Sequence, residues 1–165
     1  MKGVTCSNCG KEAKIVRGSY YFIEGGLDCV VLQGIELIRC KHCDNEDPII
    51  PRINDLMRTL AVAVIFKPHR LRGNEFRFVR KYLAKTGEET GQMLGVNKAT
   101  ISKWENNEDP IGEQSDRLFR IIALATGEGL KDKLQEMINL FPRIDREPES
   151  VRIEINPTEM SHRYV

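Results

Sequence analysis

The stretch GVNKATISKWENN, residues 95–107, is polar at most positions, yet Ile101 and Trp104 stand three residues apart within it. Residues at this spacing lie on one face of an α-helix. Asn97 is a favourable N-cap, because its side-chain oxygen can accept a hydrogen bond from the first helical turn. We therefore expect a short helix that is held by two apolar side chains and leaves its polar side chains exposed.

The segment TGEETGQMLG (86–95) predicts another short helix directly before this one. Thr86 and Glu89 have the spacing of a capping box, and Gly95 is a typical helix terminator. A short helix, a tight turn and a helix with a polar outer face form the helix-turn-helix pattern, in which the second helix enters the major groove of DNA. The structural alternative is a small helical bundle whose outer faces are merely solvated.

The second helix of this pair carries side chains suited to contact base edges. Lys and Thr can hydrogen-bond to bases, and a small Ala permits close approach or contact with a thymine methyl group. Between residues 67 and 109 nine Lys or Arg stand against six Asp or Glu, and the excess gathers in 67–81, where phosphate contacts would fix the register. The candidate contacts to double-stranded DNA are Asn97, Lys98, Ala99, Thr100, Lys103 and Asn106.

Helical patterns continue on both sides of the pair. Residues 73–85, 113–127 and 129–141 carry apolar residues at helical spacing. In 113–127 we expect the inward face to consist of Leu118, Ile121, Ile122 and Ala125.

Two further segments leave alternatives open. Asn54 or Asp55 can cap a helix that runs to about Phe66, although LAVAVIF (60–66) also fits a strand. VRIEI (151–155) alternates, so it could form an edge strand, pair with a partner chain, or lie in a flexible tail.

Five cysteines, all in the first quarter of the chain, indicate a metal site rather than disulfides. Their number is odd and no export signal precedes them. Two CxxC pairs, Cys6/Cys9 and Cys40/Cys43, can complete a tetrahedron of thiolates around a structural Zn²⁺. An iron–sulfur cluster stays open as an alternative, whereas a redox CxxC would need a strand-to-helix context. Cys29 is interpreted as a small apolar strand residue, and His42 as an exposed residue that could replace a cysteine ligand.

Strand-like segments lie between the two pairs, at 14–23, 27–33 and 35–40. Gly25-Gly26 and Gly34 separate them as turn signals. A sheet of this size buries too little apolar surface to be stable alone, so the metal would supply the missing stability.

Composition limits the function classes. Of 165 residues 41% are hydrophobic and 30% charged, with a net charge of +1, as in a soluble globular protein. No apolar run approaches the ~20 residues that span a bilayer, and the N-terminus lacks a secretory pattern, so no membrane partner and a cytoplasmic location are expected. No catalytic set of side chains or phosphate-binding glycine loop stands out, and the histidines are scattered, so an enzyme is not expected.

The segment LRGNEFRFVRKYLAKTGEETGQMLGVNKATISKWENNEDP (71–110) resembles the Xre/Cro-type helix-turn-helix. Together with the two CxxC pairs and YYFIEGGLDCVVLQGIELIRCKHCDNED (20–47), it resembles the MqsA (YgiT-type) antitoxin family over about residues 4–125. The resemblance implies a zinc-binding N-terminal domain and a homodimeric DNA-binding regulator. In some members the zinc domain also neutralises a toxin protein.

Residue by residue, the resemblance assigns the four CxxC cysteines to zinc and Lys98, Ala99, Thr100 and Lys103 to the recognition helix. Trp104 and Glu105 match the pair that closes that helix. The chain departs from the pattern at Gly87, where Xre-type domains have a DNA-contacting Gln, and at Thr90, an apolar core position. Weaker or altered DNA binding is therefore expected.

The predicted fold is α+β, with a small zinc-bound antiparallel β domain followed by an all-α five-helix Xre/Cro-like helix-turn-helix domain. The expected divisions are a zinc-binding β domain (1–50), a linker helix (51–70), the helix-turn-helix domain (71–127), and a C-terminal helix and tail (128–165). Three functions compete: a DNA-binding regulator, an interaction module that grips a toxin or other partner while the helices dimerise, and a metal or thiol sensor.

Overall fold

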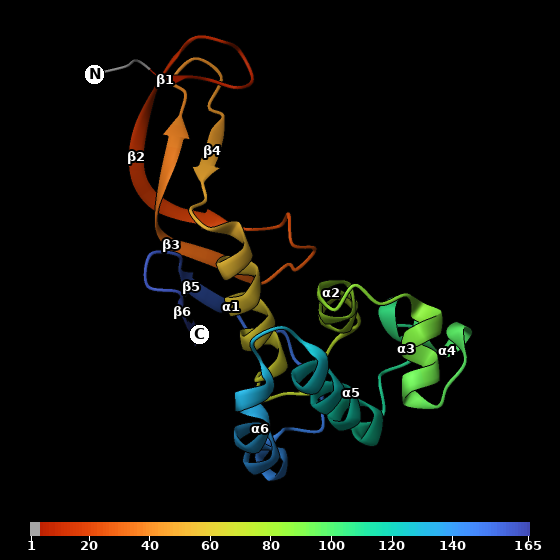
Figure 1. Ribbon diagram of the computed structural model, residues 1–165. Helices are drawn as coiled ribbons and strands as arrows, with labels where there is room; N and C mark the ends of the chain where they lie inside the picture. Colours follow the sequence, from red (N-terminus) through yellow and green to blue (C-terminus); the bar gives the residue numbers. More distant parts are fainter. Residues whose placement is uncertain (1–3) are drawn as a thin grey trace.

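Six strands and six α-helices form residues 4–165, the part of the chain that the computed structural model describes (Figure 1). The strands are β1 (Val4–Thr5), β2 (Glu12–Tyr21), β3 (Val30–Arg39), β4 (Glu46–Ile49), β5 (Ile153–Asn156) and β6 (Ser161–Tyr164). The α-helices are α1 (Ile53–Ile65), α2 (Gly73–Tyr82), α3 (Gly87–Leu94), α4 (Lys98–Glu105), α5 (Glu113–Thr126) and α6 (Leu134–Leu140). Single 3-10 turns at Lys131–Lys133 and Phe141–Arg143 flank α6.

The strands form one mixed sheet in the order β1-β2-β3-β5-β6, with β4 also paired to β3. β5 runs parallel to β3, and the other pairs are antiparallel. The expected antiparallel β domain followed by an all-α five-helix domain is therefore wrong. The C-terminal segment returns to the N-terminal sheet because β5 buries Ile153 and Ile155 there, and α1 joins the helical set to make six.

We expected Gly34 to separate two strands, but it lies inside β3 with φ 68°. Opposite it the register shifts: Gly18 pairs with Ile35, whereas Tyr20 pairs with Leu32. One extra residue on β3 is the signature of a β-bulge, and glycine suits the left-handed position. The bulge lies where β3 changes partners, from β5 at residues 30–32 to β4 at residues 36–39.

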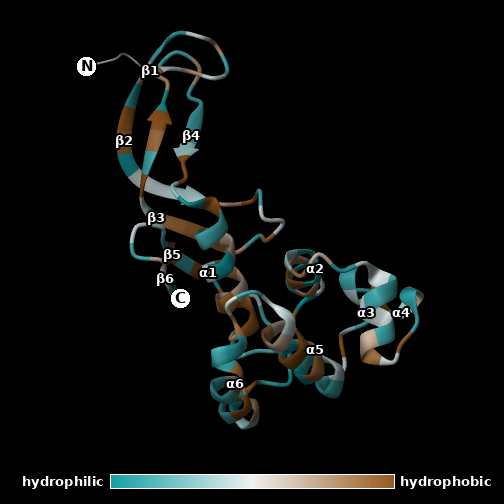
Figure 2. Ribbon diagram, in the orientation of Figure 1, coloured by the Kyte–Doolittle hydropathy of each residue, from teal (hydrophilic) through white to brown (hydrophobic). Residues whose placement is uncertain are grey.

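Helix α1 lies across the sheet and leads into the helical half (Figures 1 and 2). Its buried residues include Leu56, Leu60 and Val64, so the helical interpretation of this segment is confirmed. They share one continuous core with Leu37 of β3 and Phe76 of α2. The hydroxyl of Tyr164 in β6 donates to the carbonyl oxygen of Ala63 at 2.7 Å, which ties the last strand to this helix.

Two buried ion pairs fix the connection between α1 and α2. The Lys67 ammonium contacts the Glu75 carboxylate, with both side chains fully buried. Arg120 of α5 pairs with Asp116 and donates to the carbonyl oxygens of Ile65 (2.6 Å), Lys67 (2.9 Å) and His69 (2.6 Å). Arg120 therefore satisfies carbonyl groups left unpaired beyond the end of α1.

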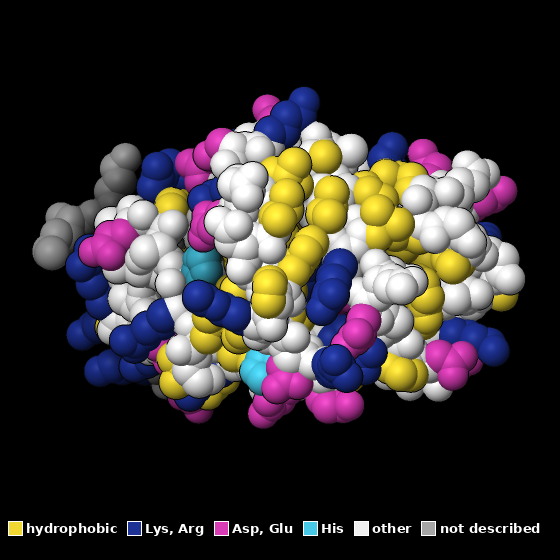
Figure 3. Space-filling model, turned by 90° about the horizontal axis from the view of Figure 1, so that it is seen from below, with side chains coloured by type: hydrophobic (Ala, Val, Ile, Leu, Met, Phe, Trp, Pro, Cys, Tyr) yellow, Lys and Arg dark blue, Asp and Glu magenta, His cyan; other side chains and the backbone are white. Residues whose placement is uncertain are grey.

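The inward face of α5 differs from the expected one. Its buried residues are Asp116, Phe119, Arg120, Ala123 and Leu124. Leu118 is 42% exposed, Ala125 is exposed, and Ile121 and Ile122 are half-buried. The error arises because the core face combines Phe119, Ala123 and Leu124 with a buried Arg–Asp pair, whose charged residues a sequence pattern assigns to the surface. Figure 3 shows hydrophobic side chains gathered over the side of the molecule where α5 and α6 lie.

No helix within residues 4–165 combines the length and the apolar character that crossing a bilayer would require.

Candidate metal centre and nucleic-acid interface

Two β-turns at one tip of the sheet bring four cysteines together. Cys6 and Cys9 lie in the turn between β1 and β2, and Cys40 and Cys43 in the turn between β3 and β4. Pairing of Lys14 with Arg39 sets the two turns side by side. Within each turn an amide donates across the knuckle, from Cys6 to the carbonyl oxygen of Lys11 and from Cys40 to that of Asn45.

The four sulfur atoms all lie within 4.8 Å of one another. The Sγ atoms of Cys6 and Cys43 are 3.6 Å apart, as are those of Cys9 and Cys40. Zn–S bonds of about 2.3 Å in a tetrahedron place sulfurs a little under 4 Å apart, so this arrangement suits such an ion. The cluster can therefore hold a metal ion, as the CxxC spacing predicted, and its four thiols leave no open coordination position.

The surroundings of the sulfurs favour negative charge at one position and oppose it at another. The amide of Cys9 lowers the pKa of Cys6 to about 7. The amide of Lys11 lowers the pKa of Cys9, but burial and the neighbouring thiols outweigh it and raise the value to about 11. Four adjacent thiolates need a cation, since metal binding requires and stabilises the deprotonated form.

The remaining candidate ligands lie outside this cluster. His42 is exposed, as expected, and only its backbone amide approaches a sulfur, Cys40 Sγ, at 3.4 Å. Cys29 is half-buried just before β3, not within a strand as expected. Burial raises the pKa of its thiol to about 11.

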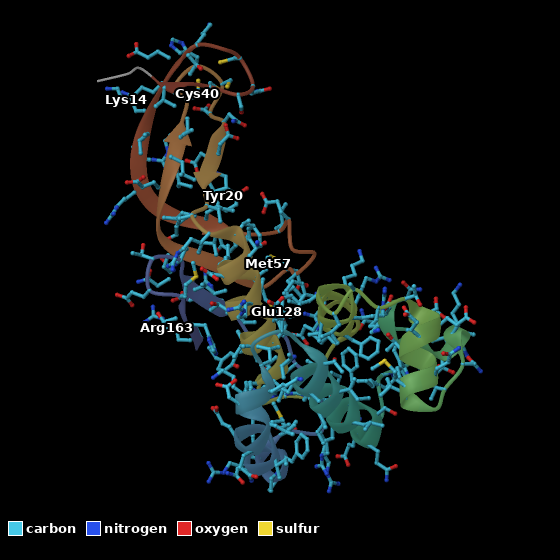
Figure 4. All side chains as sticks on the ribbon, viewed as in Figure 1. Lys14, Tyr20, Cys40, Met57, Glu128 and Arg163 are labelled. Carbon is cyan, nitrogen blue, oxygen red and sulfur yellow. The ribbon has the colours of Figure 1, made fainter. Side chains whose placement is uncertain are left out.

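At the far end of the molecule α3 and α4 form the expected helix-turn-helix geometry (Figure 4 marks Cys40 at the opposite tip). The capping box is confirmed: the amide of Glu89 donates to Thr86 Oγ1 at 3.1 Å, and the amide of Thr86 donates to the Glu89 carboxylate at 2.7 Å. Gly95 ends α3 with φ 71°. The Asn97 side chain accepts from the amide of Thr100 at 2.8 Å, which confirms it as the N-cap of α4.

Two apolar side chains hold α4 in the bundle, as the sequence predicted. Ile101 is 1% exposed and Trp104 8% exposed. The Trp104 ring meets Phe76 of α2 edge to face, with centroids 5.8 Å apart. Glu105 adds a polar link, because Arg77 and Arg80 of α2 both pair with its carboxylate.

The six candidate DNA contacts do not share one environment. Asn97, Lys98, Ala99, Lys103 and Asn106 are exposed, whereas Thr100 is half-buried. The hydroxyl of Thr100 donates to Asn97 Oδ1 at 3.0 Å. Lys103 Nζ stands 3.7 Å from a carboxylate oxygen of Asp109. Whether any of them touches DNA stays a prediction.

Sequence reasoning missed Ser102 and Arg77. Ser102 is exposed one turn after Lys98, a spacing that could have placed it on the same face. Arg77 donates to Asn106 Oδ1 at 2.8 Å, so it positions that side chain from another helix. Only the three-dimensional packing of α2 against α4 reveals this contact.

The two departures from the Xre pattern are accommodated without strain. A Cβ at Gly87 would lie 3.6 Å from Ile101 and 3.9 Å from Lys98, which is ordinary contact. Thr90 is 2% exposed, and its hydroxyl donates to the carbonyl oxygen of Thr86 at 2.9 Å. Thr90 therefore leaves no buried hydroxyl unpaired.

The basic excess of residues 67–109 is only partly available to phosphate. Lys67 is buried, and Arg77 and Arg80 are committed to Glu105. Exposed cations on the helix-turn-helix side are Lys81, Lys98 and Lys103.

Neither a family model, nor a curated protein, nor a solved structure matches this chain.

Proposed function

We propose that this protein is a sequence-specific DNA-binding transcriptional regulator that carries a structural zinc ion. One observation carries the proposal: α4 is anchored by Ile101 and Trp104, and its opposite face is polar, basic and uncovered. A helix held this way after a tight turn fits the major groove. DNA as partner implies a cytoplasmic location, and the role needs no catalytic residue.

Zinc is the proposed occupant of the cysteine cluster. A four-thiolate tetrahedron in two turn-borne knuckles is its common structural site. The cluster lies at the sheet tip, away from α4, which favours a stabilising role over one in DNA contact (Figure 4).

A homodimer is the proposed assembly, because two-fold partners would present two recognition helices to half-sites one helical turn apart. Leu118 on the outer face of α5, 42% exposed and near exposed Ala125, supports this proposal, since exposed apolar surface can mark interaction sites. The resemblance to the MqsA antitoxin family is consistent with a dimeric DNA-binding regulator. It also implies a second role, in which the zinc domain neutralises a toxin.

Fluorescence anisotropy with labelled DNA from the region upstream of the gene tests the main proposal. Lys103→Ala removes an exposed cation of α4 and should weaken binding while lowering the salt dependence by about one counterion. Lys131→Ala, an exposed lysine outside the helix-turn-helix, is the control. Equal affinity of all three proteins would contradict DNA recognition by α4.

The alternative is a protein-interaction module whose zinc domain binds a toxin or other partner while the helices serve to dimerise. Ile15 and Tyr21 of β2 favour this alternative, because their exposed side chains offer apolar surface to a protein partner. If no upstream DNA binds but a protein encoded beside this one co-purifies and is released by mutation of Ile15, the alternative holds.

A further inference from the structure

A pocket of about 220 Å³ lies at the foot of α4, between the start of α2 and the segment near Pro148. Its apolar wall is formed by Leu71, Phe76, Trp104 and Ile111. An enclosed apolar cavity of about 150 Å³ accommodates benzene, and this pocket is larger and partly open to solvent. The pocket therefore has room for one aromatic ring with a short substituent.

The polar groups of the pocket favour an anion. Arg72 lines it, and its guanidinium contacts both carboxylate oxygens of Asp28, each at 3.4 Å, longer than a strong charge-assisted bond. The one carboxylate in the lining, Asp109, is 60% exposed and faces Lys103.

The side-chain oxygen of Asn107, which also lines the pocket, already accepts a hydrogen bond from the protein. This atom, Oδ1, accepts from the amide of Gly73 at 2.9 Å. A Cβ atom at Gly73 would lie 2.3 Å from the carbonyl oxygen of Trp104, so the backbones of Gly73 and Trp104 are in close contact. The close approach couples the start of α2 to the end of α4 on one side of the pocket.

We propose that this pocket binds a small aromatic carboxylate, with the ring against Trp104 and Ile111 and the carboxylate facing Arg72. Because Trp104 also anchors α4, an occupied pocket acts on the position of that helix. Binding itself does not depend on the DNA-binding function, whereas this consequence rests on it.

Trp104 is the single tryptophan of the chain, so its indole N–H gives one signal in a ¹⁵N–¹H correlation spectrum. The full-length, zinc-loaded protein is titrated with benzoate and phenylacetate, and separately with benzyl alcohol and benzylamine. We expect a saturable shift with the carboxylates and at least tenfold weaker binding of benzylamine. No saturable shift at millimolar carboxylate, or tighter binding of the amine, would overturn the proposal.

Two variants locate the site. Ile111→Phe fills the pocket and Arg72→Gln removes its cation, and each should raise the dissociation constant for benzoate at least tenfold. Ile23→Phe and Arg17→Gln make the same exchanges at exposed positions outside the pocket lining and should bind as the parent does. If Ile111→Phe misfolds, Arg72→Gln decides alone. Unchanged affinity in the folded variants would place binding elsewhere and refute the assignment.

The link to DNA is measured last, as the anisotropy of labelled upstream DNA with and without benzoate. A changed DNA affinity in the parent and an unchanged one in Arg72→Gln would support the coupling. Benzoate binding without any effect on DNA would refute the coupling while leaving the pocket assignment in place. Absence of DNA binding altogether would instead refute the proposed function.

Discussion

Buried charge at single residues determines how the two halves of the molecule meet. Lys67 and Glu75 form a fully buried pair, and the Lys67 ammonium also donates to the carbonyl oxygen of Glu149 at 2.8 Å. Burial lowers the pKa of Lys67, and the Glu75 carboxylate opposes that effect. The distant residue Glu149 therefore meets the segment between α1 and α2 at one charged contact.

Glu75→Gln should remove the counter-charge and leave Lys67 buried. Breaking one partner of a buried pair typically costs about 3–5 kcal/mol, and we expect a loss of this order in the free energy of unfolding measured with urea. Glu88→Gln, at an exposed position in α3, serves as the control and should be nearly neutral. A loss of under about 1 kcal/mol in Glu75→Gln would show that the pair is dispensable.

Gly87→Gln tests the departure from the Xre pattern at the residue level. The available space allows a side chain beside Lys98, where an amide could reach a phosphate or base. One added hydrogen bond of about 1 kcal/mol corresponds to roughly fivefold tighter DNA binding, measured by anisotropy. Gly112→Gln, where a Cβ meets nothing within 4 Å, is the matched control. Binding equal to that of the parent would mean that this position does not face DNA.

At the scale of elements, local sequence signals predicted where helices form better than they predicted which helix face is buried. The caps at Thr86 and Asn97 and the anchors in α4 follow from short-range hydrogen bonds and spacing, which are visible in sequence. The inward face of α5 was misassigned because Asp116 and Arg120 look like surface residues until the carbonyl groups they serve are known. Likewise, Gly34 was interpreted as a turn because a glycine in the left-handed region is equally typical of a turn and of a β-bulge.

Leu118→Glu should disrupt a dimer formed through the outer face of α5. A charge at the centre of an apolar contact is unfavourable for association but tolerated at an exposed position. We expect a lower molar mass by light scattering at an unchanged melting temperature. The control, Leu118→Met, should keep the parent's mass. A parent that is already monomeric would refute the proposed dimer.

At the scale of the whole molecule, the cysteine cluster could be predicted from the sequence. The way in which the C-terminal strands join the sheet that carries the cluster could not. CxxC spacing alone predicted the four sulfurs, because each pair needs only a local turn. The pairing of β5 with β3 involves segments more than a hundred residues apart, for which the sequence carries no register signal beyond the alternation of VRIEI. The small sheet thus owes its stability to both ends of the chain.

Removal of the metal by a chelator should therefore affect the tip alone. Cys6, Ala13 and Cys40 form a small cluster separate from the main core. We expect faster amide hydrogen exchange in residues 4–13 and 40–47, with unchanged Trp104 fluorescence. Cys29→Ser should keep the parent's metal content, whereas Cys40→Ser should lose it. A change in Trp104 emission on chelation would show that the ion stabilises the entire fold.

Truncation after residue 149 should be far more damaging than loss of the metal. It removes Ile153 and Ile155, both fully buried, and the Tyr164 bond to α1. Burial of two such side chains is worth about 3–6 kcal/mol, so we expect the truncated chain to be largely unfolded by circular dichroism. A cooperative thermal transition near that of the parent would contradict this.

The position of β5 also governs the order of events on the ribosome. Residue 153 leaves the exit tunnel long after residue 30, with which it pairs. The nascent chain can close its two knuckles early, but the edge of β3 at residues 30–32 stays unpaired until β5 has emerged, and an unpaired strand edge is prone to wrong associations.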